Sequence, residues 1–505
     1  MSATSHARPS VVSQALARDR LGVPSVIMFA LTAAAPLMVV GALVSSAWGW
    51  VGVTGFPLAF VIIAVVLALF SFGYVAMSRH ITNAGAFYSY ISQGLGRPLG
   101  VGGSLVALLA YNLLQIGLYG AFGFFASVIL AEKADLTVDW WILALALWLV
   151  VAVLGLLRVD VNSKVLMVLL GAELIAVTIF DFIFLSNPAE GGVSLEPWTW
   201  GSLKDAAGPA FAVAVTAFVG FEAAPVFAEE ARSKNRTVAL ATFLGLAVMV
   251  VSYAVTSWAA AVSIGVDATV PMAQTPEIAQ AGGPFFPTLA EKGGAWAADL
   301  GLILLTTSIA AAALSYHNTT ARYAFALGRE RVLPAFFGRT RARSGAPAAG
   351  SVFQTLIALA VLVLFAVQGW DPMLNLFFWL GTSGGVGVLF LVFATSLSVI
   401  FYFVKDTRGE GAWARLIAPI LSTVALGYII WLVVDNFGGL LGFQPGTENA
   451  AVWAFPAAYG AVAVIGIVWA LILRVTNRQD YDSIGLGARA NTARADAPDY
   501  ASQQS

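Results

Sequence analysis

The sequence has no cysteine and few charged residues. Asp, Glu, Lys and Arg together make up 10% of its 505 residues, whereas soluble domains usually contain about a quarter. The absence of cysteine excludes disulfides, thiol catalysis and cysteine metal sites, and the three histidines (His6, His80 and His317) are too scattered to predict a metal site. A net charge of −1 without a basic cluster gives no support for a nucleic-acid partner. We therefore predict neither a metal site nor a cofactor.

Long apolar runs take the place of the missing charge, since 59% of the residues are hydrophobic. A helix crosses the hydrocarbon core of a bilayer with about 20 apolar residues, and its backbone groups are then satisfied internally. Continuous runs such as 140–157 do not alternate as the strands of a membrane barrel would. We predict an all-α polytopic membrane protein with twelve transmembrane helices, at 24–46, 52–77, 98–131, 140–157, 163–185, 208–229, 237–264, 296–327, 350–368, 373–404, 412–435 and 450–474.

The distribution of positive charge predicts the orientation. With the amino terminus inside, only Lys133, Lys204 and Lys292 of the 26 Lys and Arg residues lie outside, as the positive-inside rule requires. The same rule best explains a run of arginines at and after the end of the eighth helix, and a gate ion pair from them to Glu229 or Glu230 is the alternative. The run comprises Arg322, Arg329, Arg331, Arg339, Arg341 and Arg343. We predict a multi-pass protein of a bacterial cytoplasmic (inner) membrane with both termini in the cytoplasm.

Polar composition sets the limits of the membrane domain. We expect disordered cytoplasmic tails at 1–20 and 476–505, because both are rich in small, polar and charged residues, around a single membrane transport domain at 21–475. The connection 265–295 is rich in proline and glycine, which predicts an external loop with a short helix at most. Such a loop is placed to cover an external vestibule.

Two of the predicted helices carry the same proline-ended pattern. Residues 29–36 of the first helix read Phe-Ala-Leu-Thr-Ala-Ala-Ala-Pro, and residues 218–225 of the sixth read Phe-Val-Gly-Phe-Glu-Ala-Ala-Pro. The second copy enters the membrane from the opposite face, which indicates an inverted repeat of helices 1–5 and 6–10 followed by two extra helices. Transporters with such repeats break a helix in each half, and the half-helix ends form the binding site. Chance recurrence in an alanine-rich chain is the alternative.

Three stretches carry a resemblance to a known family. They are Ala-Phe-Val-Gly-Phe-Glu at 217–222 with Glu-Glu-Ala-Arg-Ser-Lys-Asn-Arg at 229–236, Thr-Asn-Ala-Gly-Ala-Phe-Tyr-Ser-Tyr at 82–90, and Ala-Arg-Tyr-Ala-Phe-Ala-Leu-Gly-Arg-Glu-Arg-Val-Leu-Pro at 321–334. Over nearly the whole membrane core the chain resembles the amino acid-polyamine-organocation superfamily of secondary transporters. It departs from the family signature at Asn235, which is not followed by proline.

The resemblance implies a five-plus-five inverted-repeat fold with broken helices 1 and 6 around a central substrate site. Family members often have a glycine-rich break in helix 1 that holds a substrate carboxylate, whereas residues 32–36 here read Thr-Ala-Ala-Ala-Pro. A substrate without a carboxylate is therefore an alternative. Helix contacts and core packing are the alternative explanations for the predicted substrate-binding residues, which are Thr32, Ala33, Ala34, Ala35, Tyr111, Asn112, Gln115, Thr216, Phe218, Gly220 and Phe221.

Two acidic residues within the predicted spans are the candidates for ion coupling. Glu222 follows the expected break of helix 6, where the resemblance implies a role in gating and proton coupling. Glu173 lies near the middle of helix 5, at a position where several relatives place a lysine that substitutes for a sodium ion. A carboxyl group inside the membrane is costly and requires a partner or a function. The structural alternatives are a carboxylate that caps free amides at the break and a neutral acid bonded between helices.

These observations predict a transporter and not an enzyme. We expect a permease that imports an amino acid or related amine by alternating access, as a symporter with a proton or, less favoured, sodium. A polyamine or organic cation carrier or exchanger is the alternative, and a membrane sensor that binds a ligand without transport is a third, low-ranked one. The expected partners are a small-molecule substrate, the coupling ion and the lipid bilayer. The sequence does not determine the substrate, the transport mode or the oligomeric state.

Overall fold

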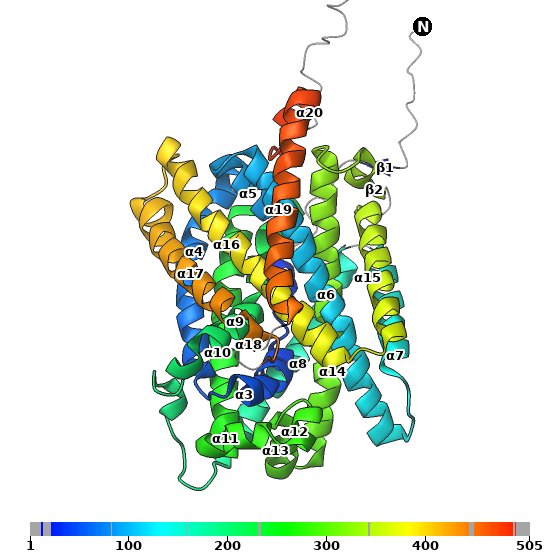
Figure 1. Cartoon of the computed structure of the whole chain (residues 1–505), viewed down its shortest axis with the longest axis vertical. Helices are drawn as coiled ribbons and strands as arrows, with labels where there is room; N and C mark the ends of the chain where they lie inside the picture. The colour runs from blue at the N-terminus through cyan, green and yellow to red at the C-terminus, as the bar shows by residue number, and fades with distance from the viewer. Residues whose placement is uncertain are drawn as a thin grey trace, which may run out of the picture.

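Helices that run along one long axis make up almost all of the structure (Figure 1). The computed structural model describes residues 12–13, 22–81, 83–157, 159–230, 234–341, 344–443, 449–487 and 490. Within these residues, the all-α polytopic prediction is confirmed, since eleven helical segments are long and apolar enough to cross a membrane. The predicted fourth span is a shorter apolar helix, α7.

The first repeat and its connections contain the following elements: α1 (Val23–Ala34), α2 (Pro36–Met38), the π-helical η1 (Val39–Val44), α3 (Ser45–Val51), α4 (Phe56–His80), α5 (Ala86–Gly94), α6 (Arg97–Ala134), α7 (Trp140–Leu154), α8 (Val159–Ser186), and the short 3-10 helices η2 (Glu196–Trp198) and η3 (Lys204–Ala206). The segments from α1 to α3 together form the first span.

The second repeat contains α9 (Ala207–Phe218), the 3-10 helix η4 (Phe221–Phe227), α10 (Lys234–Ile264), α11 (Val266–Ala273), α12 (Pro276–Gln280), α13 (Phe285–Gly293), α14 (Ala295–Arg329), the 3-10 helix η5 (Ala335–Gly338), α15 (Ala348–Gln368), the π-helical η6 (Pro372–Leu380) and α16 (Gly381–Lys405). The remaining helices are the π-helical η7 (Trp413–Ile417), α17 (Ala418–Asp435), α18 (Phe437–Leu440), α19 (Ala450–Thr476) and α20 (Arg478–Ser483).

The two interrupted spans lie at the centre of the bundle. In their most apolar windows, 89% of the span Val23–Val51 and 94% of the span Lys204–Phe227 are buried, against 22% of the last span, Ala450–Thr476. Small residues allow this close packing, because alanines 33, 34 and 35 of the first span carry no more than a methyl group. The exposed aliphatic and aromatic side chains of the peripheral spans provide the surface that faces lipid.

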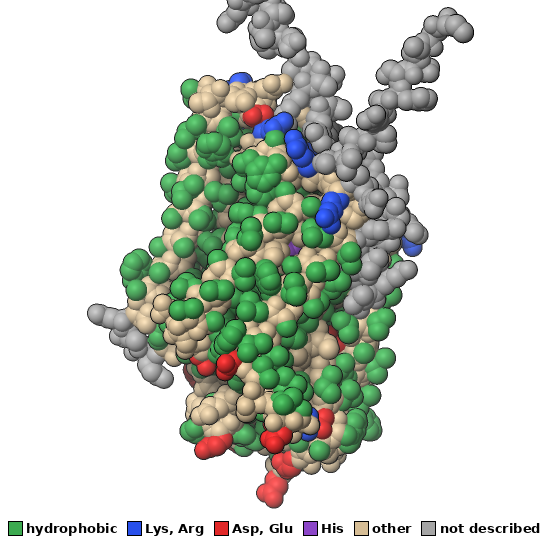
Figure 2. Space-filling model, turned by 90° about the vertical axis from the view of Figure 1, so that its right-hand side faces the viewer, with side chains coloured by type: hydrophobic (Ala, Val, Ile, Leu, Met, Phe, Trp, Pro, Cys, Tyr) green, Lys and Arg blue, Asp and Glu red, His purple; other side chains and the backbone are tan. Residues whose placement is uncertain are grey.

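The two ends of the bundle differ in charge. One end, here called the tail end, carries α5, α20 and a two-stranded pairing of β1 (Val12–Ser13) with β2 (Thr340–Arg341) (Figure 1). The opposite end, called the loop end, carries α3 and α11 to α13. Figure 2 shows Lys and Arg gathered towards the tail end, most of the Asp and Glu towards the loop end, and a broad hydrophobic surface between them.

Two regions are more ordered than the sequence indicated. The connection after α10 contains three short helices, α11, α12 and α13, where we expected a loop with a short helix at most. Residues within the expected disordered tails are also folded: Val12–Ser13 pairs with β2, and residues 478–487 form α20 and a buried turn. Polar composition does not reveal this order, because the stretch after α20 is held by hydrogen bonds to a buried carboxylate and not by an apolar core.

Candidate functional site

The first span breaks at Ala35. This residue has a left-handed backbone conformation, with φ of 45°, which is costly for a residue with a side chain. Pro36 follows and begins α2 without an N–H group to donate. The next amide, that of Leu37, donates to Glu173 Oε1 at 2.6 Å. The predicted break in helix 1 is therefore present, and a carboxylate already occupies the amino end of its second half.

The sixth span breaks at Val219 and Gly220, before the proline that we had singled out. Gly220 has a φ of 118°, and a Cβ there would lie 2.7 Å from Ala33 Cβ and 2.9 Å from the Ala30 carbonyl oxygen. A glycine is thus required both by the backbone conformation and by the contact with helix 1. The break in helix 6 therefore packs directly against helix 1.

Two tyrosines satisfy backbone groups that the breaks set free. Tyr253 of α10 donates to the carbonyl oxygens of Ala34, at 3.2 Å, and Ala217, at 3.0 Å, one from each broken span. Tyr316 of α14 donates to Val219 O at 3.0 Å. Neither tyrosine was predicted from the sequence, although a lone hydroxyl in an apolar span was a signal that it has a buried partner.

The Tyr253 contacts give a direct prediction. We expect Tyr253→Phe to lower the free energy of unfolding by about 1 to 3 kcal/mol, because two carbonyl groups at the breaks lose a buried donor. The measurement is the thermal unfolding midpoint of the purified protein in detergent. Tyr428→Phe is the matched control, since Tyr428 is 59% exposed. Equal midpoints for the two variants would show that the hydroxyl does not stabilise the breaks.

Glu222 is buried beside the second break, with a relative exposure of 1%. Its Oε2 accepts the Gly220 amide and its Oε1 accepts the Tyr111 hydroxyl, both at 2.8 Å. Tyr74 donates to its backbone carbonyl at 2.9 Å. The side chain thus caps the amide that the break frees, and it also links helix 6 to α6. The two groups that donate to the Glu222 carboxylate are neutral. They therefore do not compensate a change in the charge of Glu222.

Glu173 joins three spans. It is 3% exposed on α8, and besides the Leu37 amide it accepts the Ser308 hydroxyl of α14 at 2.8 Å. Residues 37 and 308 belong to different repeats, so the carboxylate connects the broken first helix to the eighth span. A buried group that contacts elements of both repeats is well placed to sense their relative movement.

A small cavity lies between the two breaks and has a volume of about 30 Å³, enough for a water-sized molecule. No charged side chain is among its lining residues. The cavity is lined by Ala33, Ala34, Met38, Val39, Leu43, Leu114, Leu118, Thr216, Ala217, Tyr316, Phe377, Gly381 and Thr382. Thr32, the residue before the lining Ala33, does not line the cavity, and its buried Oγ1 has no hydrogen-bond partner in the described chain.

The predicted substrate-binding residues separate into three groups. Ala33, Ala34 and Thr216 line the cavity, and Thr32, Ala35 and Gly220 belong to the breaks. The others do not line it. Phe218 packs on Phe60 and Tyr253, Phe221 packs on Phe70, and Tyr111 binds Glu222.

The polar residues of α6 beyond Tyr111 face other partners. Asn112 donates to Leu108 O at 2.7 Å, within its own helix. Gln115 lies in a separate buried cluster, in which its amide contacts Tyr119 and His317, and Gln354 of α15 donates to its carbonyl oxygen. These residues connect spans outside the cavity. Sequence reasoning missed the cavity residues Met38, Leu118 and Phe377, because an apolar residue that lines a site looks the same in one sequence as an apolar residue in the core.

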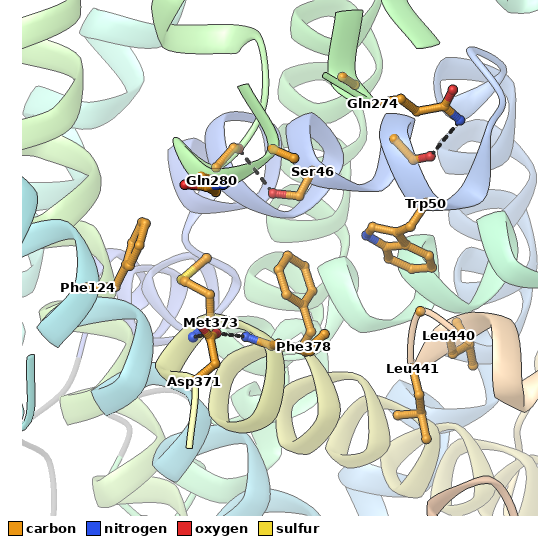
Figure 3. Close-up of a pocket in the computed structure, with 16 residues that line it drawn as sticks. Ser46, Trp50, Phe124, Gln274, Gln280, Asp371, Met373, Phe378, Leu440 and Leu441 are labelled. Carbon is orange, nitrogen blue, oxygen red and sulfur yellow. Dashed lines mark hydrogen bonds between the residues drawn. The ribbon is translucent and has the colours of Figure 1, made fainter. Parts of the chain in front are cut away.

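A wide vestibule lies at the loop end, with a volume of about 1000 Å³ (Figure 3). Trp50, Phe124 and Phe378 stand around it. The connections on both sides of α12 are bonded to α3: Gln274, before α12, donates to Gly49 O, and Ser46 donates to Gly282 O, after α12. Asp371 is the one acidic residue among the described residues that line it, and its carboxylate accepts the amides of Met373 and Leu374.

The tail end is closed by two ion pairs. Arg322 Nε lies 2.6 Å from Glu230 Oε2, and both side chains are almost completely buried. Arg329 binds both carboxylate oxygens of Glu229, at 2.7 and 2.8 Å. The alternative considered for these arginines, ion pairs with the acidic pair after helix 6, is therefore realised. Both ion pairs lie at the tail end, whereas the larger hollow lies at the loop end.

The fold and this arrangement define a class, that of multi-pass membrane transporters with a central site between two broken helices. Residues 21–471 match the family model described as amino acid permease, so the chain belongs to that family and to the amino acid-polyamine-organocation superfamily. A search of curated proteins found no match. The family gives the protein a role in the transport of an amino acid or amine, which is a small-molecule substrate.

Proposed function

We propose that the protein is a secondary active transporter that imports a neutral amino acid with a small, apolar side chain by alternating access. The observation that carries the proposal is the cavity between the breaks, which is bordered by aliphatic and hydroxyl side chains and by no charged group among the described residues. A charged side chain would lose its hydration there without a partner. The small volume favours a small substrate and requires the site to widen as it binds.

Hydroxyl groups of the two broken spans suit the charged ends of an amino acid. The unpartnered Thr32 hydroxyl and the Thr216 hydroxyl lie on the two broken spans, and Thr216 already donates to Ala212 O and so can accept a bond. The amino end of α2, which would attract a carboxylate, is held by Glu173 instead. In this proposal the substrate carboxylate is bound by hydroxyl groups and by the remaining polar backbone.

The direction of transport follows from the charge distribution. We place the basic tail end in the cytoplasm and the acidic loop end outside, as the positive-inside rule requires. The vestibule then faces outward, and the buried ion pairs close the cytoplasmic side. We infer a proton as the coupling ion, because Glu222 and Glu173 are buried carboxyl groups at the breaks. One proton that moves through 100 mV supplies about 2.3 kcal/mol, enough for about 40-fold accumulation of a neutral solute.

The cavity wall gives a prediction about selectivity. Leu118 of α6 lines the cavity and is 3% exposed. We expect Leu118→Ala to raise the kcat/KM ratio of a large aliphatic substrate over a small one by about tenfold, because the removed carbons leave space for a larger side chain. Leucine and alanine are the probes. Leu113→Ala is the matched control on the same helix, since Leu113 is half-buried and does not line the cavity. An unchanged ratio in Leu118→Ala would contradict the proposed side-chain pocket.

Uptake into proteoliposomes tests the proposed function. The panel is radiolabelled alanine, leucine, glutamate, lysine and putrescine, each with an imposed proton gradient, a sodium gradient or neither. We expect concentrative uptake of alanine, weaker uptake of leucine, and no uptake of glutamate or lysine, with the proton gradient alone. Uptake driven by sodium would contradict the proposed coupling ion and leave the substrate class intact.

A polyamine or organic cation carrier is the second candidate, and the two buried carboxylates favour it. Their oxygens already accept four bonds from amide and hydroxyl groups, and neither residue lines the cavity. A cation would have to displace those donors. Concentrative uptake of putrescine in the same panel, without uptake of alanine, would replace the first candidate with this one. Saturable binding without uptake or exchange would favour the sensor alternative.

A further inference from the structure

The chain does not leave the bundle when its last span ends. The helix α20 continues from α19 at the tail end (Figure 1), and residues from Tyr481 to Gly487 pack against the bundle there. Tyr481 is 7% exposed and Ile484 is 1% exposed, as buried as residues of the membrane core. We call residues 481–487 the terminal segment. Its burial is unusual for a stretch with so little apolar character.

A buried carboxylate receives the terminal segment. Glu330, the residue after α14, is completely buried. The Gly487 amide donates to its Oε1 at 2.8 Å, and the Gly485 amide donates to its Oε2. Gly485 has a φ of 80° and Gly487 a φ of 62°, and these positive angles let both amides point at one anion. Tyr88 completes the arrangement with a bond to Oε2 at 2.7 Å.

The terminal segment also contacts α5 and the start of α6. Arg97 binds the Asp482 side chain at 2.8 Å and its backbone carbonyl at 3.1 Å, and its guanidinium lies over the Tyr481 ring. Gln93 donates to Gly485 O at 3.2 Å. The terminal segment therefore links two places that belong to different repeats. One is the connection between the second and third spans, and the other is the end of the eighth span.

The contacts of Glu330 continue directly into the ion pair that closes the tail end. Asn83 donates to Glu330 Oε1 at 2.5 Å, and its own side-chain oxygen accepts Arg329 Nη2 at 3.3 Å. Arg329 in turn pairs with Glu229, which also accepts the Ala84 amide at 3.0 Å. The terminal segment, Glu330 and the ion pair of Arg329 with Glu229 thus form one continuous polar network. Opening of the tail end would have to separate groups within it.

We infer that the terminal segment is a latch that holds the tail end closed and has to release each time the transporter opens to the cytoplasm. The inference goes beyond the proposed function, because it concerns the conformational equilibrium and holds for any substrate. Release strips amide donors from a buried carboxylate, and this opposes opening. The latch thereby favours the outward-facing state and sets how often the protein opens inward.

Cysteine labelling tests the latch independently of transport. The chain has no cysteine, so a single introduced thiol is the only one present. Ala84→Cys reports on the tail end, because Ala84 is completely buried beside the ion pair, and Ala279→Cys reports on the exposed loop end. Removal of residues 478–505 is expected to raise the rate at which a maleimide labels Ala84→Cys by about tenfold, equivalent to about 1.4 kcal/mol. The rate at Ala279→Cys is expected not to rise.

Two controls and a second variant make the test specific. Removal of residues 491–505 leaves the terminal segment in place and should change the labelling rate by less than about twofold. In the full chain, Gly485→Val should act as the large truncation does, because Gly485 has positive φ and a Cβ would lie 2.9 Å from Ser92 Cβ. Gly409→Val is its matched control, with φ of 78° and no atom within 4 Å. Labelling of Ala84→Cys that stays at the full-chain rate in both the truncation and Gly485→Val would overturn the latch.

Discussion

Arg322→Met is expected to open the tail end of the protein. Arg322 and Glu230 are 2% and 1% exposed, and the substitution leaves the Glu230 carboxylate buried without its guanidinium partner. Loss of one partner of a buried ion pair costs about 3 to 5 kcal/mol. The cost falls on the state in which the tail end is closed, so the ratio of closed to open molecules should fall by about two to four orders of magnitude.

The measurement is the rate of maleimide labelling at Ala84→Cys, together with uptake of the substrate. We expect faster labelling and loss of concentrative uptake, because a gate that does not close lets substrate return. Removal of both charges, in Arg322→Met with Glu230→Met, should restore slow labelling, since an apolar pair of similar volume is often as stable as the ion pair. Arg408→Met is the exposed control, with Arg408 3.7 Å from Asp406. Equal labelling in Arg322→Met and Arg408→Met would show that the buried pair does not close the tail end.

Glu222→Gln is expected to abolish proton-driven accumulation while the protein stays folded. The glutamine keeps one acceptor oxygen for the Gly220 amide or the Tyr111 hydroxyl, but it cannot exchange a proton. Accumulation should fall from about 40-fold to the level of equilibration. Exchange of labelled for unlabelled substrate, which requires no net proton movement, should continue in the same vesicles.

The control for Glu222→Gln is Glu410→Gln. Glu410 lies at the tail end, where it pairs with Arg79 and His80, and its loss should leave accumulation unchanged. Full proton-driven accumulation in Glu222→Gln would mean that this carboxylate only caps the break. The same assay on Glu173→Gln then separates the two acids. Retained accumulation in Glu173→Gln would mean that Glu222 alone couples the proton to transport. Loss of accumulation would mean that Glu173, which accepts the Leu37 amide, takes part in coupling as well.

The sequence was sufficient for the membrane architecture because each span is encoded locally. A run of apolar residues has to be a helix in a bilayer, whatever surrounds it. The break in helix 1 was also predictable, because Pro36 removes a donor at a fixed position. The break in helix 6 was expected before Glu222, within the pattern that ends at Pro225, and it lies there, at Val219 and Gly220. There the contact with Ala33, far away in the chain, determines where the helix ends.

The site was less predictable because its contacts are distant in the sequence. Tyr253 reaches the Ala34 carbonyl across 219 residues, and Glu173 reaches the Leu37 amide across 136. Neither pairing follows from spacing or composition. The polar residues of α6 illustrate the same limit: they were placed on the right span, but the rotation of the helix directs Gln115 to His317 and Gln354 and away from the cavity.

The position of the terminal segment has a consequence for biosynthesis. Glu330 and the Gly485 amide are separated by 155 residues. The chain is synthesised from its amino terminus at about 5 to 20 residues per second, so the carboxylate precedes this donor by roughly 8 to 30 seconds. In that interval every span can enter the membrane while the network at Glu330 still lacks two of its amides. We therefore expect a translation product that stops after α19 to insert all of its spans. It would differ from the full-length protein in the stability of the closed state at the tail end.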